Sequence, residues 1–147
     1  MRFTTLLFLL SFSFGIYSAD QAKSADDENY GNVVVSEVTS IYDGDTFRCT
    51  IKDWPRIIGY RIPVRVAGID CPELKDNRPE IKELARKAKQ HTVQRLREGK
   101  IIELRNMVRD KYFRICAEVW IDSISLGYEL IILKLAKPYD GGKKEKW

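Results

Sequence analysis

The organisation of the chain is clearest in residues 60–99, which read YRIPVRVAGIDCPELKDNRPEIKELARKAKQHTVQRLREG. Apolar and other residues alternate from Tyr60 to Ala67, a pattern that predicts a strand with one buried face. A loop is expected from Gly68 to Asn77. Pro79 then begins a helical pattern that runs to about Glu98, because proline is favoured at a helix start and Gly99 follows its end. This stretch therefore predicts a strand, a loop and a long helix in succession.

Two further strands are predicted on each side of this stretch, and a second helix after them. Val33 to Tyr42 and Thr46 to Ile51 flank the turn residues Asp43-Gly44-Asp45, which is typical of a hairpin. Lys100–Met107 and Phe113–Ile121 are the later strands. The second helix is expected from about Ile124 to Ala136, with Asp122 or Ser123 as its N-cap.

The predicted order is β-β-β-α-β-β-α, with one helix between the third and fourth strands. This is the order of a five-stranded OB-type Greek-key β-barrel, so the expected fold class is α+β with two helices. Pro63 lies inside the third strand, and a proline there favours an edge position or a bulge.

Composition limits the class of protein. The chain has 147 residues, room for one domain, and its 44% hydrophobic and 31% charged content excludes wholesale disorder. Three cysteines and one histidine exclude a zinc finger, a dense disulfide framework and a multi-histidine metal centre. The formal net charge is +4, which is compatible with a polyanionic partner but does not establish one.

The N-terminus has the composition of a targeting segment. Arg2 precedes an uncharged, Leu- and Phe-rich run from Phe3 to Ala19, which predicts a signal peptide over residues 1–19. The protein is then expected to be exported, either secreted or periplasmic, without stable membrane association. The alternative is an uncleaved N-terminal membrane anchor, for which the run is at the short limit.

The remainder divides into an acidic leader, a basic domain and a tail. Residues 20–32 are expected to be a flexible leader, residues 33–138 the folded domain and residues 139–147 a tail. From Val33 onward the chain has 23 basic and 17 acidic residues, so the domain is more basic than the whole chain. No apolar repeat beyond the expected core indicates an oligomer, and a monomer is expected.

Three segments carry the candidate chemistry: Asp43-Gly44-Asp45-Thr46, Arg65 to Glu73, and Asp110 to Arg114. Hydrolysis of a phosphodiester requires cationic groups that neutralise the anion, and a base that activates water. Carboxylates at strand ends are suited to a hard cation such as Ca²⁺, and guanidinium groups are suited to phosphate. Each segment alone is also typical of an ordinary turn or loop. Their combination, in this order, favours a nuclease site.

These segments resemble the thermonuclease family, the staphylococcal-nuclease-like calcium-dependent nucleases, from about Val33 to Ala136. The resemblance implies Asp45, Asp70 and the backbone carbonyl of Cys71 as calcium ligands, Arg65 and Arg114 as phosphate-binding arginines, Glu73 as the general base, and Lys111 and Tyr112 as contacts to a terminal phosphate. It also implies cleavage of DNA and RNA that leaves 3′-phosphate ends.

Among the departures of the sequence from the family pattern, two lie within these segments. Cys71 stands where threonine is frequent, a change that retains the backbone carbonyl. Phe113 stands where glycine is common, immediately before Arg114. Tyr139 is a further candidate, for stacking on a base.

A second hypothesis is a non-catalytic nucleic-acid-binding OB module. The basic balance and the barrel fit both hypotheses. The acidic residues discriminate between them, because Asp45, Asp70 and Glu73 would repel a phosphate and benefit a pure binder in no way.

Overall fold

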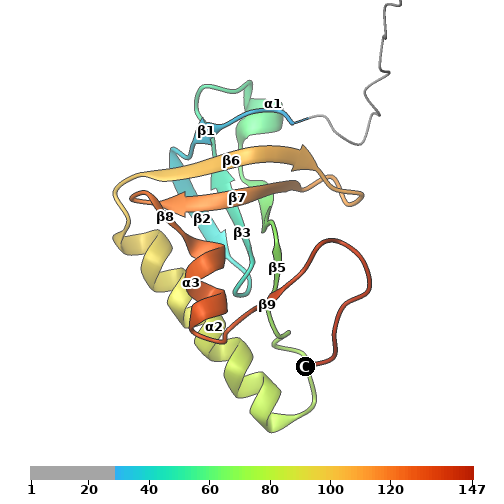
Figure 1. Cartoon of the computed structure of the whole chain (residues 1–147). Helices are drawn as coiled ribbons and strands as arrows, with labels where there is room; N and C mark the ends of the chain where they lie inside the picture. Colours follow the sequence, from blue (N-terminus) through green and yellow to red (C-terminus); the bar gives the residue numbers. More distant parts are fainter. Residues whose placement is uncertain (1–28) are drawn as a thin grey trace, which may run out of the picture.

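Residues 29–147 are described by the structure, a computed structural model, and form a mixed α+β fold with helices packed on a curled sheet (Figure 1). The expected signal peptide, residues 1–19, and residues 20–28 of the expected leader lie outside the described residues. Within residues 29–147, every helix is too short or too polar to cross a membrane.

The main sheet contains most of the strands. In spatial order it consists of β1 (Val33–Val34), β6 (Ile102–Arg109), β7 (Ile115–Ile121), β4 (Ile62–Val66), β3 (Thr46–Thr50) and β2 (Glu37–Ile41), with β8 (Ile124–Ser125) paired to β7. All neighbours are antiparallel except β4 and β7, which are parallel. A second, two-stranded sheet joins β5 (Ile69–Asp70) to β9 (Lys137–Pro138).

One continuous segment of the chain forms both edge strands of the main sheet, β1 and β2. β1 pairs with β6 and β2 pairs with β3, and the change of partner occurs between Val35 and Ser36. The Val35 amide donates to the carbonyl of Ile102 at 2.8 Å, whereas the Ser36 amide donates to the carbonyl of Thr50 at 2.9 Å. The single strand expected from Val33 to Tyr42 is therefore two strands, and it links the two edges of the curled sheet.

The five longer strands correspond to the five that the sequence predicts. The described residues also contain four two-residue strands and a short helix, α1 (Arg56–Gly59), that the prediction of five strands and two helices did not include. The expectation for Pro63 is corrected, because β4 lies between β3 and β7 and is not an edge strand. Pro63 is accommodated because the pairing with β7 begins only at Val64.

The long helix, α2 (Pro79–Glu98), has the predicted bounds. Its buried residues recur at helical spacing and face the sheet: Ala85, Ala88, Thr92 and Leu96. The lysines and arginines of the helix lie on its other faces. The amphipathic pattern thus fixes which side of α2 packs on the curled sheet, and this side also contacts the candidate site.

The second predicted helix is α3 (Leu126–Ile132), which is shorter than expected. Its N-cap is Ser125, whose hydroxyl accepts a hydrogen bond from the Tyr128 amide at 3.3 Å. Asp122 does not cap the helix, because its carboxylate accepts from the Ile101 amide at 2.9 Å. The helix ends early because Lys134 has a φ of 56°, which is a left-handed conformation.

Residues 29–32, expected as the end of the leader, lie against β6. The Tyr30 amide donates to the carbonyl of Met107 at 2.8 Å, and the side chain of Asn32 accepts from the Asn106 amide at 2.9 Å. The ordered domain thus begins before Val33. Backbone hydrogen bonds of this kind are the reason that it does.

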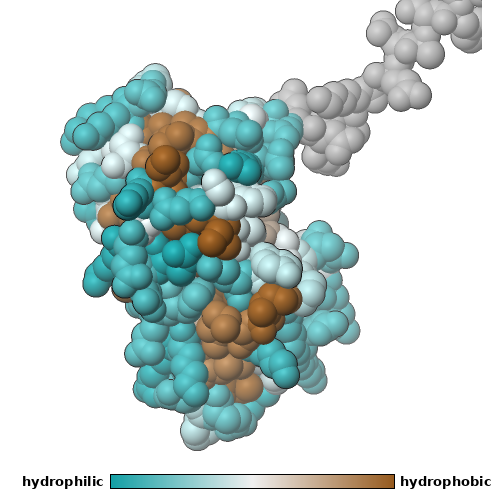
Figure 2. All heavy atoms as spheres, turned by 60° about the vertical axis from the view of Figure 1, so that its left-hand side comes forward, coloured by the Kyte–Doolittle hydropathy of each residue, from teal (hydrophilic) through white to brown (hydrophobic). Residues whose placement is uncertain are grey.

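The core is continuous and mostly aliphatic, with Phe47 as its largest buried side chain. The visible face in Figure 2 is mostly hydrophilic, with separate hydrophobic patches. Among residues 29–147 only three polar or charged side chains are buried, Asp45, Asp70 and Thr92. Two of these are carboxylates, and a buried carboxylate requires a partner.

Candidate active site

The turn between β2 and β3 positions the first carboxylate. The Asp43 carboxylate accepts from the Asp45 amide at 3.2 Å, and the buried hydroxyl of Thr92 on α2 donates to the Gly44 carbonyl at 2.7 Å. A Cβ atom at Gly44 would lie 2.8 Å from the Cys71 sulfur and 2.9 Å from the Ala88 Cβ. Glycine is needed here because the helix and the loop approach the turn so closely.

Asp45 and Asp70 converge on one guanidinium, that of Arg65. Arg65 forms an ion pair with Asp45 Oδ1, and its second terminal nitrogen lies 3.1 Å from Asp70 Oδ1. The carboxylates are 2% and 6% exposed, respectively. The register of β3 and β4 produces this arrangement, since it sets Thr46 opposite Arg65. We call Asp45, Arg65 and Asp70 the buried centre.

Further hydrogen bonds hold Asp45 in place. Its Oδ2 accepts from the Cys71 amide at 2.7 Å, and its Oδ1 accepts from the Thr46 hydroxyl at 3.0 Å. Both carboxylate oxygens are therefore engaged by neighbours on two different chain segments.

Glu73 lies at the rim of the buried centre. Its carboxylate is half exposed and forms an ion pair with Lys75, whose Nζ lies 2.9 Å from Glu73 Oε2. Lys144 also faces it, with Nζ 2.7 Å from Asp70 Oδ1 and 3.9 Å from Glu73 Oε1. The Lys144 ammonium group thus contacts both the Asp70 carboxylate of the buried centre and the Glu73 carboxylate at its rim.

Lys144 belongs to residues 139–147, which the sequence predicts to be a tail. This segment is held across the site rather than extending away from it. The Tyr139 amide donates to the Gly68 carbonyl at 2.9 Å, and Lys137 donates to the carbonyl of Lys146 at 2.6 Å. Figure 1 shows the segment after β9 looping outward and returning to the loop between β5 and α2, where the C-terminus lies.

Asp110 organises the turn from Asp110 to Arg114, which we call the arginine turn. One carboxylate oxygen accepts from the amides of Tyr112 at 2.8 Å and Arg114 at 2.9 Å, and the other accepts from Arg114 Nε at 2.7 Å. Partial burial raises the pKa of Asp110, but these hydrogen bonds outweigh it and the net pKa is lowered. The Arg114 guanidinium lies 5.3 Å from the centre of the Tyr112 ring.

Phe113 adopts a φ of 63° in this turn. Glycine has no steric penalty in this left-handed conformation, which explains physically why it suits the position. The phenylalanine is 79% exposed, so it adopts the conformation without entering the core. The Phe113 amide donates to the Asp110 carbonyl at 3.0 Å, so the turn closes with a phenylalanine present.

A single hollow of about 740 Å³ brings together the residues that the sequence predicts. All eight line it: Asp45, Arg65, Asp70, Cys71, Glu73, Lys111, Tyr112 and Arg114. Tyr139 lines it as well. They come from the β2–β3 turn, β4, the loop after β5, and the arginine turn, so the fold assembles them from distant parts of the chain.

Eight further residues of the hollow were not selected from the sequence, among them Asp43, Thr46, Lys89 and Lys144. Asp43 and Thr46 lie in the Asp-Gly-Asp-Thr motif, so their neighbours were a signal for them. Nothing in the pattern of the C-terminal residues indicates that Lys144 reaches Asp70.

Burial controls protonation at two positions of the hollow. Desolvation raises the pKa of Asp43, although the nearby Arg65 opposes this shift. Desolvation also raises the pKa of the Cys71 thiol to about 12, so the sulfur is neutral near pH 7. Cys71 therefore contributes its backbone to the site, and its thiol is unsuited to nucleophilic or metal-binding chemistry.

All three cysteines of the chain are free. Cys49 is buried in the core, where desolvation raises the pKa of its thiol to about 12 as well.

The oxygen donors in and beside the buried centre fit a hard divalent cation in their chemistry. Asp45, Asp70 and the hydroxyl of Thr46 offer oxygen, which is the ligand atom that Ca²⁺ prefers. Within residues 29–147 no three His, Cys, Asp or Glu side chains form a metal-binding cluster. A bound ion would thus take two carboxylates and complete its shell with backbone carbonyls and water.

Comparison with known proteins shows the family to which the chain is similar. Residues 63–146, more than half of the chain, match the family described as staphylococcal nuclease homologue. The matched region contains all predicted site residues except Asp45, which precedes it. No curated protein matches the chain.

Proposed function

We propose that this chain, which belongs to the family of staphylococcal nuclease homologues, is a calcium-dependent nuclease that hydrolyses phosphodiester bonds in DNA and RNA. Family membership supports a nuclease-type hydrolase with a nucleic-acid substrate. One observation carries the finer proposal: two buried carboxylates, an exposed carboxylate and two arginines line one hollow.

Arg65 and Arg114 bind the scissile phosphate in this proposal. Guanidinium groups present paired N–H donors that match phosphate oxygens, and the charge they neutralise increases as water attacks phosphorus. Arg114 Nε donates to the Asp110 carboxylate at 2.7 Å, which orients Arg114. Arg65 is oriented by its ion pairs with Asp45 and Asp70. Both side chains are therefore held before the substrate arrives, so less conformational entropy is lost on binding.

Asp45, Asp70 and the backbone carbonyl of Cys71 would hold the calcium ion. When bound, calcium supplies charge that neutralises the phosphate and orients it for attack. The buried centre supports this role, because its two carboxylates converge on one point and are already faced by cations. Lys144 contacts Asp70 where such a cation would bind.

Glu73 acts as the general base. Its carboxylate is exposed at the rim, where water reaches it, and it accepts the proton that an attacking water loses. The water oxygen bonds to phosphorus, the bond from phosphorus to the 5′ oxygen breaks, and the departing 5′ oxygen takes a proton from solvent water. The products are one chain with a 3′-phosphate and one with a 5′-hydroxyl.

Lys111 and Tyr112 extend the site beyond the scissile phosphate. Lys111 Nζ lies 5.2 Å from the centre of the Tyr112 ring, so both groups are presented together to a second phosphate. Export as a secreted or periplasmic protein is part of the proposal and rests on the uncharged run from Phe3 to Ala19. A monomer is proposed as the active form.

The proposal is tested by incubating the purified protein with single-stranded DNA, and separately with RNA, in calcium and then in excess chelator. We expect cleavage in calcium only, with fragments whose 3′ ends are resistant to extension until a phosphatase treats them. Tight binding without cleavage in calcium would instead support a non-catalytic binding module.

A further inference from the structure

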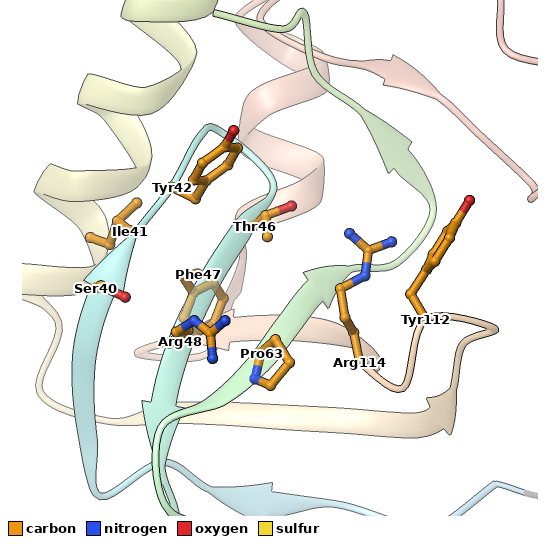
Figure 3. A pocket seen from close by; sticks show the side chains of 9 residues that line it. All are labelled: Ser40, Ile41, Tyr42, Thr46, Phe47, Arg48, Pro63, Tyr112 and Arg114. Atoms are coloured by element: carbon orange, nitrogen blue, oxygen red, sulfur yellow. The ribbon is translucent and has the colours of Figure 1, made fainter.

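A second hollow, of about 580 Å³, lies beside the candidate active site on the outer face of the sheet. It is lined by residues of β2, β3, β4 and the arginine turn: Ser40, Ile41, Tyr42, Thr46, Phe47, Arg48, Pro63, Tyr112 and Arg114 (Figure 3). Tyr42, Thr46, Tyr112 and Arg114 also line the first hollow. The two hollows are therefore adjacent, and a ligand long enough to occupy both would pass beside Arg114.

The strand register places Arg48 one step beyond the buried centre. Thr46 pairs with Arg65, and Arg48 pairs with Pro63 in the next row of the same face. Two residues along a strand advance by about 6.6 Å, because alternate side chains share a face. Arg48 therefore stands on the same surface as Arg65, displaced along the strands from the proposed phosphate site.

The positive charge of the Arg48 guanidinium is available to a ligand. Its guanidinium donates to the carbonyl of Arg61 at 3.1 Å. Unlike Arg65 and Arg114, it forms no ion pair with a carboxylate among residues 29–147. A guanidinium has five N–H donors, so one backbone contact leaves most of them available.

Two tyrosines flank this hollow. Tyr42 is 74% exposed and Tyr112 is 66% exposed. Figure 3 shows them on opposite sides of Thr46 and Arg114, one from the β2–β3 turn and one from the arginine turn. Exposed aromatic faces beside cationic groups are the features that bind single-stranded nucleic acid, since unpaired bases stack on them.

We propose that this hollow is a nucleotide subsite next to the scissile phosphate, in which Arg48 contacts the neighbouring phosphate and Tyr42 stacks on an unpaired base. The inference rests on the proposed function for the direction of the substrate. It deepens that function, because the subsite selects a flexible single strand that continues past the cleaved bond. A base inside a duplex is already stacked and gains nothing from Tyr42.

Binding in chelator tests the subsite without requiring cleavage. The probe is a fluorescently labelled oligothymidylate, and its affinity is measured by anisotropy over a range of salt concentrations. For Arg48→Gln we expect the slope of log K against log salt to fall by about 0.7, the contribution of one phosphate contact on a single strand. For Tyr42→Ala we expect affinity to fall about fivefold or more, because a stacking platform is lost.

Matched variants separate these effects from general changes in charge or aromatic content. Arg97→Gln removes an exposed arginine of α2, and Tyr128→Ala removes an exposed tyrosine of α3, both away from the hollow. Neither is expected to change the affinity or the salt slope as Arg48→Gln and Tyr42→Ala do. Tyr42→Phe retains the ring and should retain binding of the oligothymidylate. A blunt duplex should bind to Tyr42→Ala as tightly as it binds to the wild-type protein.

The outcomes distinguish the subsite from the proposed function. Equal binding by Arg48→Gln, Tyr42→Ala and their control variants would overturn the subsite, even if the protein cleaves DNA. The expected binding pattern without calcium-dependent cleavage would retain the subsite and overturn the nuclease.

Discussion

The buried centre and the arginine turn each present an arginine to the same hollow, but they are built differently. Arg65 is enclosed by two buried carboxylates and is positioned by the register of β3 and β4. Arg114 is held by one residue, Asp110, within a turn of the chain. The comparison indicates that one site combines an arginine on which folding depends with an arginine that serves the ligand alone.

Arg65→Ala is expected to have the largest effect, because it removes both functions. Two buried carboxylates would lose their main counter-charge, and breaking such a pair costs about 3 to 5 kcal/mol. Urea denaturation should show this loss in the free energy of unfolding, and cleavage should fall as well. A free energy of unfolding within about 1 kcal/mol of wild type would contradict the described role of Arg65.

Arg114→Ala is expected to separate activity from stability. Removing one preorganised donor to developing charge lowers turnover about 100- to 1000-fold. The Asp110 ion pair is partly exposed, so the free energy of unfolding should change by less than about 1 kcal/mol. Unfolding curves and initial rates of cleavage measured on one preparation provide the test. A stability loss as large as that of Arg65→Ala would remove the distinction between the two regions.

Thr92→Val examines how α2 supports the buried centre. The buried Thr92 hydroxyl donates to the Gly44 carbonyl at 2.7 Å, and losing such a donor costs about 1 to 3 kcal/mol. Thr39→Val is the matched control, since its hydroxyl makes an exposed bond to the Arg48 carbonyl at 3.2 Å. Equal unfolding free energies for the two variants would show that Thr92 does not support the turn.

Lys144→Gln should have the smallest effect, an increase in calcium affinity. The ammonium lies 2.7 Å from Asp70 Oδ1 and is about half exposed, so it competes with a bound cation. Partly exposed pairs of this kind are worth about 0.2 to 1 kcal/mol, which corresponds to an affinity gain of about 1.5- to 5-fold. Calorimetric titration with calcium measures it, and Lys143→Gln is the neighbouring control. Weaker calcium binding by Lys144→Gln would contradict the competition.

The difference between local signals and long-range contacts also separates the features that the sequence predicted from those that it did not. The bounds of α2 follow from local signals: Pro79, Gly99 and a helical apolar face. The candidate site residues of the β2–β3 turn and β4 were named instead from the resemblance of whole segments to a family, because an acidic turn alone is an ordinary turn. The start of α3 did not follow from local signals, because Asp122 bonds to Ile101 across the fold instead of capping the helix. The position of Lys144 depends on long-range contacts of the C-terminal segment, and local patterns carry no information about these.

The account depends most on Glu73 acting as a base at this site. The direct test is Glu73→Gln, with turnover of a single-stranded oligonucleotide measured in saturating calcium and affinity measured in chelator. We predict that kcat falls at least about 100-fold, because general-base catalysis is lost, while the Kd stays within about twofold. Unchanged turnover, or a parallel loss of affinity and turnover, would contradict the account.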